Sequence, residues 1–194
     1  MKIIIFDLET SGLNPYHDDI IEIAMKVLGS EEQFTCLLRP KSNECISLTI
    51  TTLTGITNEM LVKDGLRWED AYQLMNAWLF SVKGADDKIA MVSHNGESFD
   101  FLFLKRMFND LNKLKIKSFP IHKIIPIDTL LLAKRLISGR STYRQSTLCQ
   151  QYDIETKGSH RALNDVIALE QLYVALATKL HDELGKRRKP IEYP

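Results

Sequence analysis

The stretch KIIIFDLET, residues 2–10, begins as a buried strand and ends with two acidic side chains. Residues 3–6 form the unbroken apolar run that is typical of a strand covered on both faces. Asp7 and Glu9 follow two positions apart, and on an extended chain both carboxylates point to the same side of the sheet. Two like charges at the end of a core strand are unfavourable, so either the strand has already left the core at Asp7 or the charges serve a site.

The composition indicates one globular domain. The chain has 194 residues, of which 44% are hydrophobic and 26% are charged, and its 25 basic side chains balance 25 acidic ones. A neutral chain has no global field that draws it onto a polyanion, so any affinity for nucleic acid has to come from local patches. We expect a domain over residues 1–184 and a basic C-terminal tail over residues 185–194.

Neither a signal peptide nor a membrane-spanning segment is predicted. The first apolar run ends at Asp7, which is too early for either, and no later run approaches membrane length. Cys36, Cys45 and Cys149 are odd in number and lack the paired spacing of a disulfide framework or a zinc site. We therefore expect an intracellular protein, cytoplasmic or nuclear and not secreted, with no membrane partner.

Hydrophobic periodicity predicts an α/β chain with a mixed sheet. The early strands lie close together in sequence, which favours an antiparallel meander, whereas helices separate the later strands, which favours parallel crossovers. The expected strands are 2–7, 19–29, 32–40, 88–95 and 124–127, and helices are expected between residues 47 and 84, from about 98, at 128–139, at 145–152 and from about 161 to 180. Thr57 and Asp128 stand where helix N-caps belong.

Asp100 is a third acidic residue in an apolar setting. In SFDFLFL, residues 98–104, most of its neighbours are aromatic or aliphatic, and the pattern places it inside a helix. Such a carboxylate is expensive to bury unless it is paired or binds a cation, although a solvent-facing position on the helix would also accommodate it.

His160 and Asp165 lie close together near the C-terminus, in HRALND, residues 160–165. Within one helix, five positions rotate the chain by about 140° from a shared face, so the two side chains can meet only if His160 lies in the loop or first turn. Gly158 and Ser159 supply such a loop and a candidate cap. A lone histidine at a helix start is also a common surface residue.

Four carboxylates on three separate elements match the needs of a pair of hard divalent cations. Mg²⁺ and Mn²⁺ take oxygen ligands and keep open positions for substrate phosphate and water. Two such ions, about 3.5–4 Å apart, stabilise both the attacking and the leaving oxygen of a phosphoryl displacement. A histidine that titrates near neutrality would take the proton from the attacking water.

Three motifs, FDLETSGL, HNGESFD and HRALND, resemble those of the DEDDh exonucleases, also called the DnaQ-like 3′-to-5′ exonucleases. The order and rough spacing agree along nearly the whole chain, including LTGIT at 53–57 and IDTLLLAKRL at 127–136. The resemblance implies an RNase H-like fold, in which a five-stranded mixed sheet is flanked by helices and the first strand is central.

The resemblance also implies a role for each active-site residue. Asp7 would bridge two Mg²⁺ or Mn²⁺ ions, and Glu9 and Asp165 would bind the first of them. Asp100 would hold the second ion, and His160 would be the general base. All five residues are present in this sequence.

The same resemblance places Thr10, Leu13, Asn95 and Phe99 against the substrate. The Thr10 amide would contact the terminal 3′-hydroxyl, Leu13 would wedge the last bases apart, and Asn95 and Phe99 would shape the nucleotide pocket. Three of these positions have a structural alternative: Leu13 folded onto its own strand, Phe99 packed in the core, and Asn95 holding a turn by a side-chain hydrogen bond.

The implied reaction removes nucleoside 5′-monophosphates one at a time from a nucleic-acid 3′ end, and we expect single-stranded DNA or frayed ends as substrate. The motifs are similar both to the three-prime repair exonucleases and to the proofreading epsilon subunit of replicative polymerase. The alternatives are an RNA exonuclease of the same superfamily and a catalytically silent nucleic-acid-binding adaptor. The basic segment KLKIK and Arg135, Arg140 and Arg144 are candidate phosphate contacts. A polymerase or other protein partner and the oligomeric state are not indicated.

Overall fold

The central sheet has β1 in its middle. The structure, a computed structural model, describes residues 1–42, 44–156 and 161–187. Within these residues the sheet has five strands in the order β3-β2-β1-β4-β5. The strands are β1 Lys2–Thr10, β2 Ile20–Val27, β3 Gln33–Leu37, β4 Ile89–Ser93 and β5 Ile124–Asp128. The pairs β1–β2 and β2–β3 are antiparallel and the pairs β1–β4 and β4–β5 are parallel, which confirms the predicted mixed sheet.

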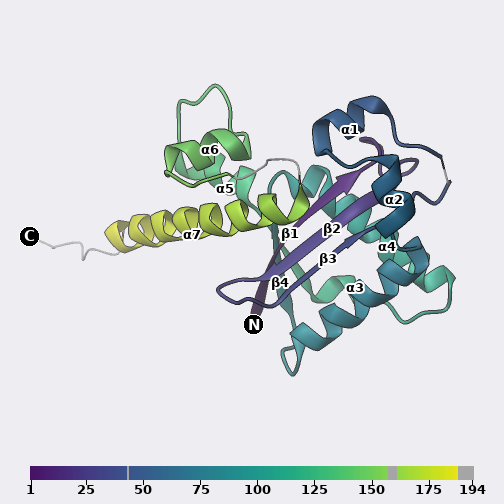
Figure 1. The fold of residues 1–194 in the computed structure, drawn as a ribbon. Helices are drawn as coiled ribbons and strands as arrows, with labels where there is room; N and C mark the ends of the chain where they lie inside the picture. Colours follow the sequence, from purple (N-terminus) through teal and green to yellow (C-terminus); the bar gives the residue numbers. More distant parts are fainter. Residues whose placement is uncertain (43, 157–160, 188–194) are drawn as a thin grey trace, which may run out of the picture.

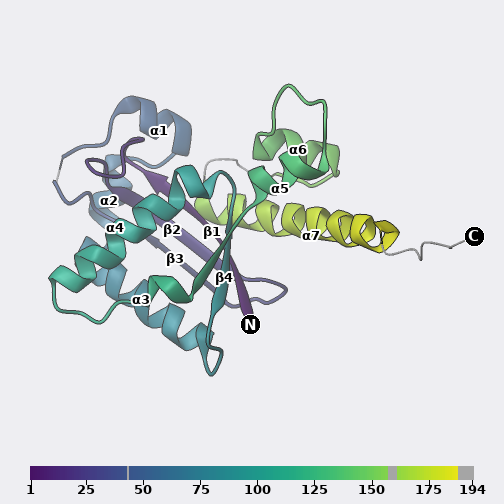
Figure 2. The same ribbon diagram turned by 180° about the vertical axis from the view of Figure 1, so that it is seen from behind.

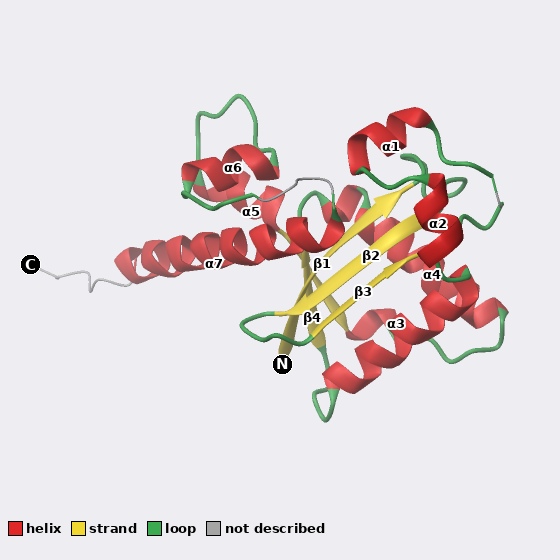
Figure 3. Cartoon of the chain, viewed as in Figure 1, coloured by secondary structure: helices red, strands yellow, loops and turns green. Residues whose placement is uncertain are grey.

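Helices cover both faces of this sheet, as Figure 1 and Figure 3 show. The α-helices are α1 Leu48–Thr54, α2 Asn58–Asp64, α3 Trp68–Lys83, α4 Asp100–Lys113, α5 Thr129–Leu136, α6 Gln145–Gln151 and α7 Ala162–Arg187, with short 3₁₀ turns η1 Gly96–Ser98 and η2 Ile121–Lys123. In the view from behind, α3 and α4 lie on the opposite side of the sheet from α7 (Figure 2). This arrangement confirms the RNase H-like architecture that was expected.

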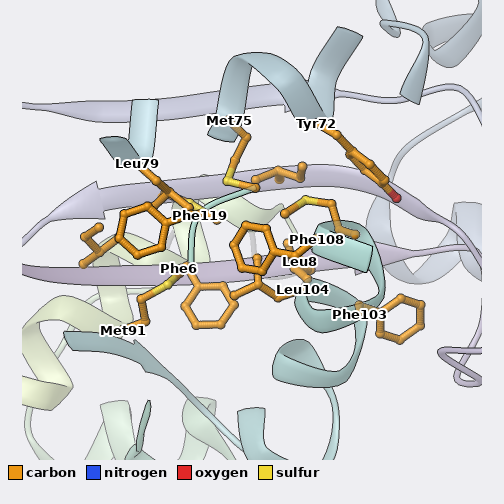
Figure 4. Close-up of a cluster of buried hydrophobic side chains, with 14 of the residues drawn as sticks. Phe6, Leu8, Tyr72, Met75, Leu79, Met91, Phe103, Leu104, Phe108 and Phe119 are labelled. Atoms are coloured by element: carbon orange, nitrogen blue, oxygen red, sulfur yellow. The ribbon is translucent and has the colours of Figure 1, made fainter. Parts of the chain in front are cut away.

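Side-chain alternation along β1 divides the core into two layers. Ile4, Phe6 and Leu8 pack with α3 and α4 in a cluster rich in aromatic and methionine side chains (Figure 4). Ile5, one position out of phase, packs instead with side chains of α5, α6 and α7. Asp7 continues the phase of Ile5, so the strand itself directs the acidic side chains toward the α7 layer.

Strand β1 and helix α7 are longer than predicted because pairing and packing extend them, whereas the strands predicted as 19–29, 32–40 and 88–95 are shorter in the structure. The strand predicted as 2–7 continues to Thr10, since Glu9 pairs with Glu22 and Thr10 with Ile20 on β2. The last helix was predicted to end near Leu180, where its apolar pattern fades, yet it continues to Arg187. The predicted tail from residue 185 therefore starts inside this helix, and its residues 188–194 lie outside the described part of the chain.

The structure confirms the predicted N-cap of α2. The Thr57 hydroxyl accepts a hydrogen bond from the Met60 amide at the start of α2, as an N-cap does. Cys36, Cys45 and Cys149 are all free thiols. Among the described residues, no helix has the length and hydrophobicity needed to cross a membrane.

Candidate active site

Asp7, Glu9 and Asp165 meet at the end of β1. One oxygen from each of the three carboxylates lies within 4.8 Å of the other two. Asp7 and Glu9 reach this point because both follow the phase of Ile5 toward the α7 layer, while Asp165 comes from the first turn of α7. Glu9 and Asp165 are 156 positions apart in sequence, and packing of α7 on β1 and β2 brings them together.

Asp100 is not one of the three converging carboxylates, but its charge acts on Asp7. It is the first residue of α4 and not an interior one as predicted, and its side chain is buried, with 3% of the residue exposed. Pairing between β1 and β4 ends at Ile5 and Val92, so the β1 backbone beyond that point has an open edge. The Leu8 backbone amide acts on the Asp100 carboxylate there and partly offsets the rise in its pKa that burial causes.

The turn that leads to Asp100 is held by Asp128 at the end of β5. Its Oδ1 accepts the amide of Asn95 at 3.0 Å and its Oδ2 accepts the amide of Glu97 at 3.1 Å. Oδ1 also accepts the Leu130 amide at 2.8 Å, which confirms the predicted N-cap of α5. One carboxylate thus fixes both the start of α5 and the turn before α4.

Close packing in the same turn requires a glycine at position 96. A Cβ atom on Gly96 would lie 1.6 Å from the Ser93 hydroxyl oxygen. Asn95 precedes it with φ at 63°, a left-handed conformation that asparagine tolerates better than most residues. The turn is therefore a fixed spacer between β4 and Asp100.

Crowding of the carboxylates perturbs their protonation. Burial, followed by the charges of Asp165, Glu22 and Asp100, raises the pKa of Glu9 to about 8. Burial also raises the pKa of Asp100 to about 7. The pKa of Asp7 lies well above its usual range, again through burial first and then through the charge of Asp100. These groups resist sharing one small volume as anions.

The donor set fits divalent cations of the Mg²⁺ or Mn²⁺ type. All the converging atoms are carboxylate oxygens, which such ions prefer. Within the described ranges, neither Asp7 nor Glu9 forms an ion pair with a lysine or arginine. Arg161 acts on Glu9 without forming an ion pair with it, and a bound cation would supply positive charge directly against both carboxylates.

The predicted substrate residues differ in burial and in their contacts. Thr10 is buried, and its hydroxyl donates to the Gly12 carbonyl at 2.6 Å. Leu13 is 83% exposed, so it is not folded onto its own strand. Phe99 packs partly into the core beside Phe103, with ring centroids 5.0 Å apart. Asn95 holds its turn through the backbone amide described above, and not through its side chain.

The loop that carries Leu13 is braced from α4. The Arg106 guanidinium donates to the carbonyls of Pro15 at 2.9 Å and Asp18 at 2.7 Å, and it pairs with the Asp19 carboxylate at 3.2 Å. Leu13 is therefore an exposed apolar side chain on a loop held at several points.

A cavity of about 630 Å³ lies next to Asp165. Its wall includes Asn95 from the β4–α4 turn and Lys134 and Arg144 from the α5–α6 region. Within the described residues, these two basic side chains form no ion pair. A Gln145 side-chain N–H donates to the Asp165 carbonyl at 3.0 Å and ties the same wall to α7.

The predicted base His160 lies outside the described residues, so its position is not given by the structure.

Sequence reasoning missed Glu22 and Arg161, which join β2 to the start of α7. The signal for Glu22 was a charge within IIEIAMKV, an otherwise apolar strand, which is the same irregularity that marked Asp7.

Residues 4–173 match the RNase T family, whose members are described as exonucleases. The chain belongs to this exonuclease family. Its membership confirms the resemblance to DnaQ-like exonucleases that the motifs carry. The structure agrees with that resemblance, because β1 is central in the sheet and Asp7, Glu9 and Asp165 meet at its end.

Relatives of this exonuclease domain include much longer proteins. The chain is 34% identical over 193 residues to the PolC-type DNA polymerase III of Bacillus subtilis, covering 94% of this chain and 12% of that protein. It is 32% identical over 173 residues to the PolC-type DNA polymerase III of Mycoplasma pneumoniae, covering 88% of this chain and 11% of the relative. The chain thus spans roughly one-eighth to one-ninth of these relatives.

Solved structures share the fold. Exonuclease I of Escherichia coli in complex with a dA16 oligonucleotide superimposes with a TM-score of 0.73 at 19% identity, over 97% of this chain and 44% of that one. A zinc-bound complex of the same enzyme with single-stranded DNA gives a TM-score of 0.74 at 20% identity, over 97% of this chain and 43% of that one.

Proposed function

We propose that this chain is a metal-dependent 3′-to-5′ exonuclease that hydrolyses nucleic acid to nucleoside 5′-monophosphates. The observation that carries the proposal is the convergence of Asp7, Glu9 and Asp165 within 4.8 Å, with Asp100 buried against the same strand. A site of four carboxylates with raised pKa values is suited to binding cations and poorly suited to remaining empty and charged.

The residues divide the work between holding cations and guiding the strand. Asp7, Glu9 and Asp165 would hold one Mg²⁺ or Mn²⁺ ion, and Asp7 and Asp100 a second. Bound divalent cations would stabilise the charge that develops on the attacking and leaving oxygens of the phosphodiester. By family resemblance, His160 takes the proton from the attacking water.

Two features flank the carboxylates as a path for the strand. On the braced loop, exposed Leu13 would separate the terminal base from its neighbours, and the Thr10 amide would meet the 3′-hydroxyl. Asn95 and Phe99 would shape the pocket for the terminal nucleotide. The cavity beside Asp165 presents Lys134 and Arg144, two cations free to neutralise backbone phosphates.

We infer DNA as the substrate, as single strands or frayed 3′ ends. The support is that the matched relatives are named DNA polymerases and that the solved neighbours hold DNA oligonucleotides. In this view the chain performs a proofreading or repair type of trimming.

The test uses 5′-labelled DNA and RNA oligonucleotides of the same sequence. With Mg²⁺ or Mn²⁺ we expect DNA to shorten from its 3′ end in one-nucleotide steps, with loss of activity in chelator and in Asp7→Ala and Asp165→Ala. His160→Ala should keep metal binding and lose most turnover. Preferential shortening of RNA would replace DNA as the substrate, and binding without shortening would favour the adaptor function.

A further inference from the structure

Glu22 on β2 is a buried carboxylate whose hydrogen bonds, among the described residues, go to Arg161 and Ala162 at the start of α7. Its side chain is 7% exposed. It accepts hydrogen bonds from the Arg161 Nε at 3.2 Å and Nη2 at 2.8 Å, and from the Ala162 backbone amide at 2.9 Å. Because Ala162 is the first residue of α7, Glu22 satisfies a free amide at the helix start from another element.

A second ion pair joins the same strand to the same helix with the charges reversed. Lys26 Nζ lies 2.6 Å from the Glu170 carboxylate, and both side chains are largely buried. The other oxygen of Glu170 accepts the Gly29 amide at 2.7 Å. Strand β2 therefore anchors α7 at a near point, Glu22, and at a far point, Lys26.

The two anchors match in spacing. Glu22 and Lys26 are four strand residues apart, a rise of about 13 Å. Glu22 accepts the amide of Ala162, and Ala162 and Glu170 are eight positions apart in α7, which is about 12 Å along a helix. Ala24, between the two strand anchors, is buried in the α7 layer and lets the helix approach. A slip of one residue would move the helix by about 1.5 Å and rotate it by about 100°, which would break both pairs.

We propose that Glu22 is a positioning residue for Asp165, and this inference rests on the proposed function. Asp165 lies in the first turn of α7, where its amide donates to the Arg161 carbonyl at 3.1 Å. Glu22 fixes Arg161 and Ala162, and on the sheet it stands directly opposite Glu9. Glu9, a proposed metal ligand, thus pairs across the sheet with Glu22, which anchors the helix that carries Asp165, a second proposed ligand.

Two charge-neutral double variants separate positioning from general support of the fold. Glu22→Gln/Arg161→Gln removes the near pair, and Lys26→Gln/Glu170→Gln removes the far pair as the matched control. For each, the melting temperature is measured in chelator and during titration with Mn²⁺ alone. Calorimetric titration with Mn²⁺ gives the dissociation constant independently of any nuclease activity.

We expect both variants to melt at a lower temperature without metal, and only the near variant to bind Mn²⁺ more weakly, by about fivefold or more. The control variant, Lys26→Gln/Glu170→Gln, should change the Mn²⁺ dissociation constant by less than twofold. A near variant with lowered melting temperature and unchanged Mn²⁺ affinity would overturn the positioning role. If it does not fold, Arg161→Gln is titrated alone: loss of this positive charge, which acts on Glu9, would by itself tighten Mn²⁺ binding. Weaker binding therefore supports positioning, and tighter or unchanged binding overturns it. A wild-type chain that does not respond to Mn²⁺ would overturn the proposed function itself.

Discussion

Replacing Glu9 with glutamine should stabilise the metal-free protein. Glu9 shares a small volume with Asp7 and Asp165. Burial, followed by the charges of Asp165, Glu22 and Asp100, raises the pKa of Glu9 to about 8. The folded state therefore holds the Glu9 proton more tightly than the unfolded chain does. Stability of the metal-free wild type must fall as the pH rises from about 4.5 toward 8, and this loss should be smaller in Glu9→Gln, where Asp7 and Asp100 still contribute.

The magnitude follows from the pKa. The pKa of Glu9 rises from 4.5 in the unfolded chain to about 8 in the folded protein. At pH 7 only the interval from 4.5 to 7 contributes, and at about 1.4 kcal/mol for each pH unit it costs the folded wild type about 3 kcal/mol. Part of the side chain remains in solvent, and screening reduces the expected gain of Glu9→Gln to about 2 kcal/mol. For a chain of this length the melting temperature should rise by roughly 4–8 °C.

The measurement is thermal and urea unfolding in chelator at several pH values, with Glu44→Gln as the same substitution at an exposed position. The gain should be largest at pH 7–8 and absent near pH 4.5, and saturating Mg²⁺ should remove it by stabilising only the wild type. A Glu9→Gln protein that is less stable than wild type at pH 7, or a gain independent of pH, would refute the reasoning.

Three further predictions concern the supports of the site. Asp128→Ala leaves the amides of Asn95, Glu97 and Leu130 without their acceptor. It should lower the free energy of unfolding in urea by about 2–4 kcal/mol and slow cleavage, and unchanged stability would contradict the role of Asp128 in holding the turn. Gly96→Ala should cost about 1–3 kcal/mol by the same measurement, because its Cβ meets the Ser93 hydroxyl, and Ser93→Ala should recover part of the loss. Lys134→Ala and Arg144→Ala should raise KM without changing kcat and should each reduce the slope of log KM against log salt by about 0.7; an unchanged slope would remove them from the strand path.

The sequence predicted the features that depend on neighbouring residues. The apolar run before Asp7, the period of α3 and the Thr57 cap are all set within one or two turns of chain, and each is present in the structure. The family motifs added the order in which distant acidic residues would meet. Asp7, Glu9 and Asp165 do converge, although no local pattern states their distances.

Features that depend on pairing between distant elements could not be predicted. Asp128 holds a turn more than thirty residues earlier, so its sequence neighbourhood shows only the local N-cap. Glu22 acts through Arg161, far along the chain, and a single charge in an apolar strand does not name its partner. The extension of β1 to Thr10 likewise follows from its pairing with β2, which lies beyond the loop.

The central claim is that the end of β1 is a divalent-metal site, and anomalous diffraction from crystals grown with Mn²⁺ tests it most directly. We predict an anomalous peak in contact with Asp7, Glu9 and Asp165, and a second peak between Asp7 and Asp100. Crystals of Asp7→Asn should lose both. Well-ordered carboxylates with no anomalous peak among them at saturating Mn²⁺ would contradict the account.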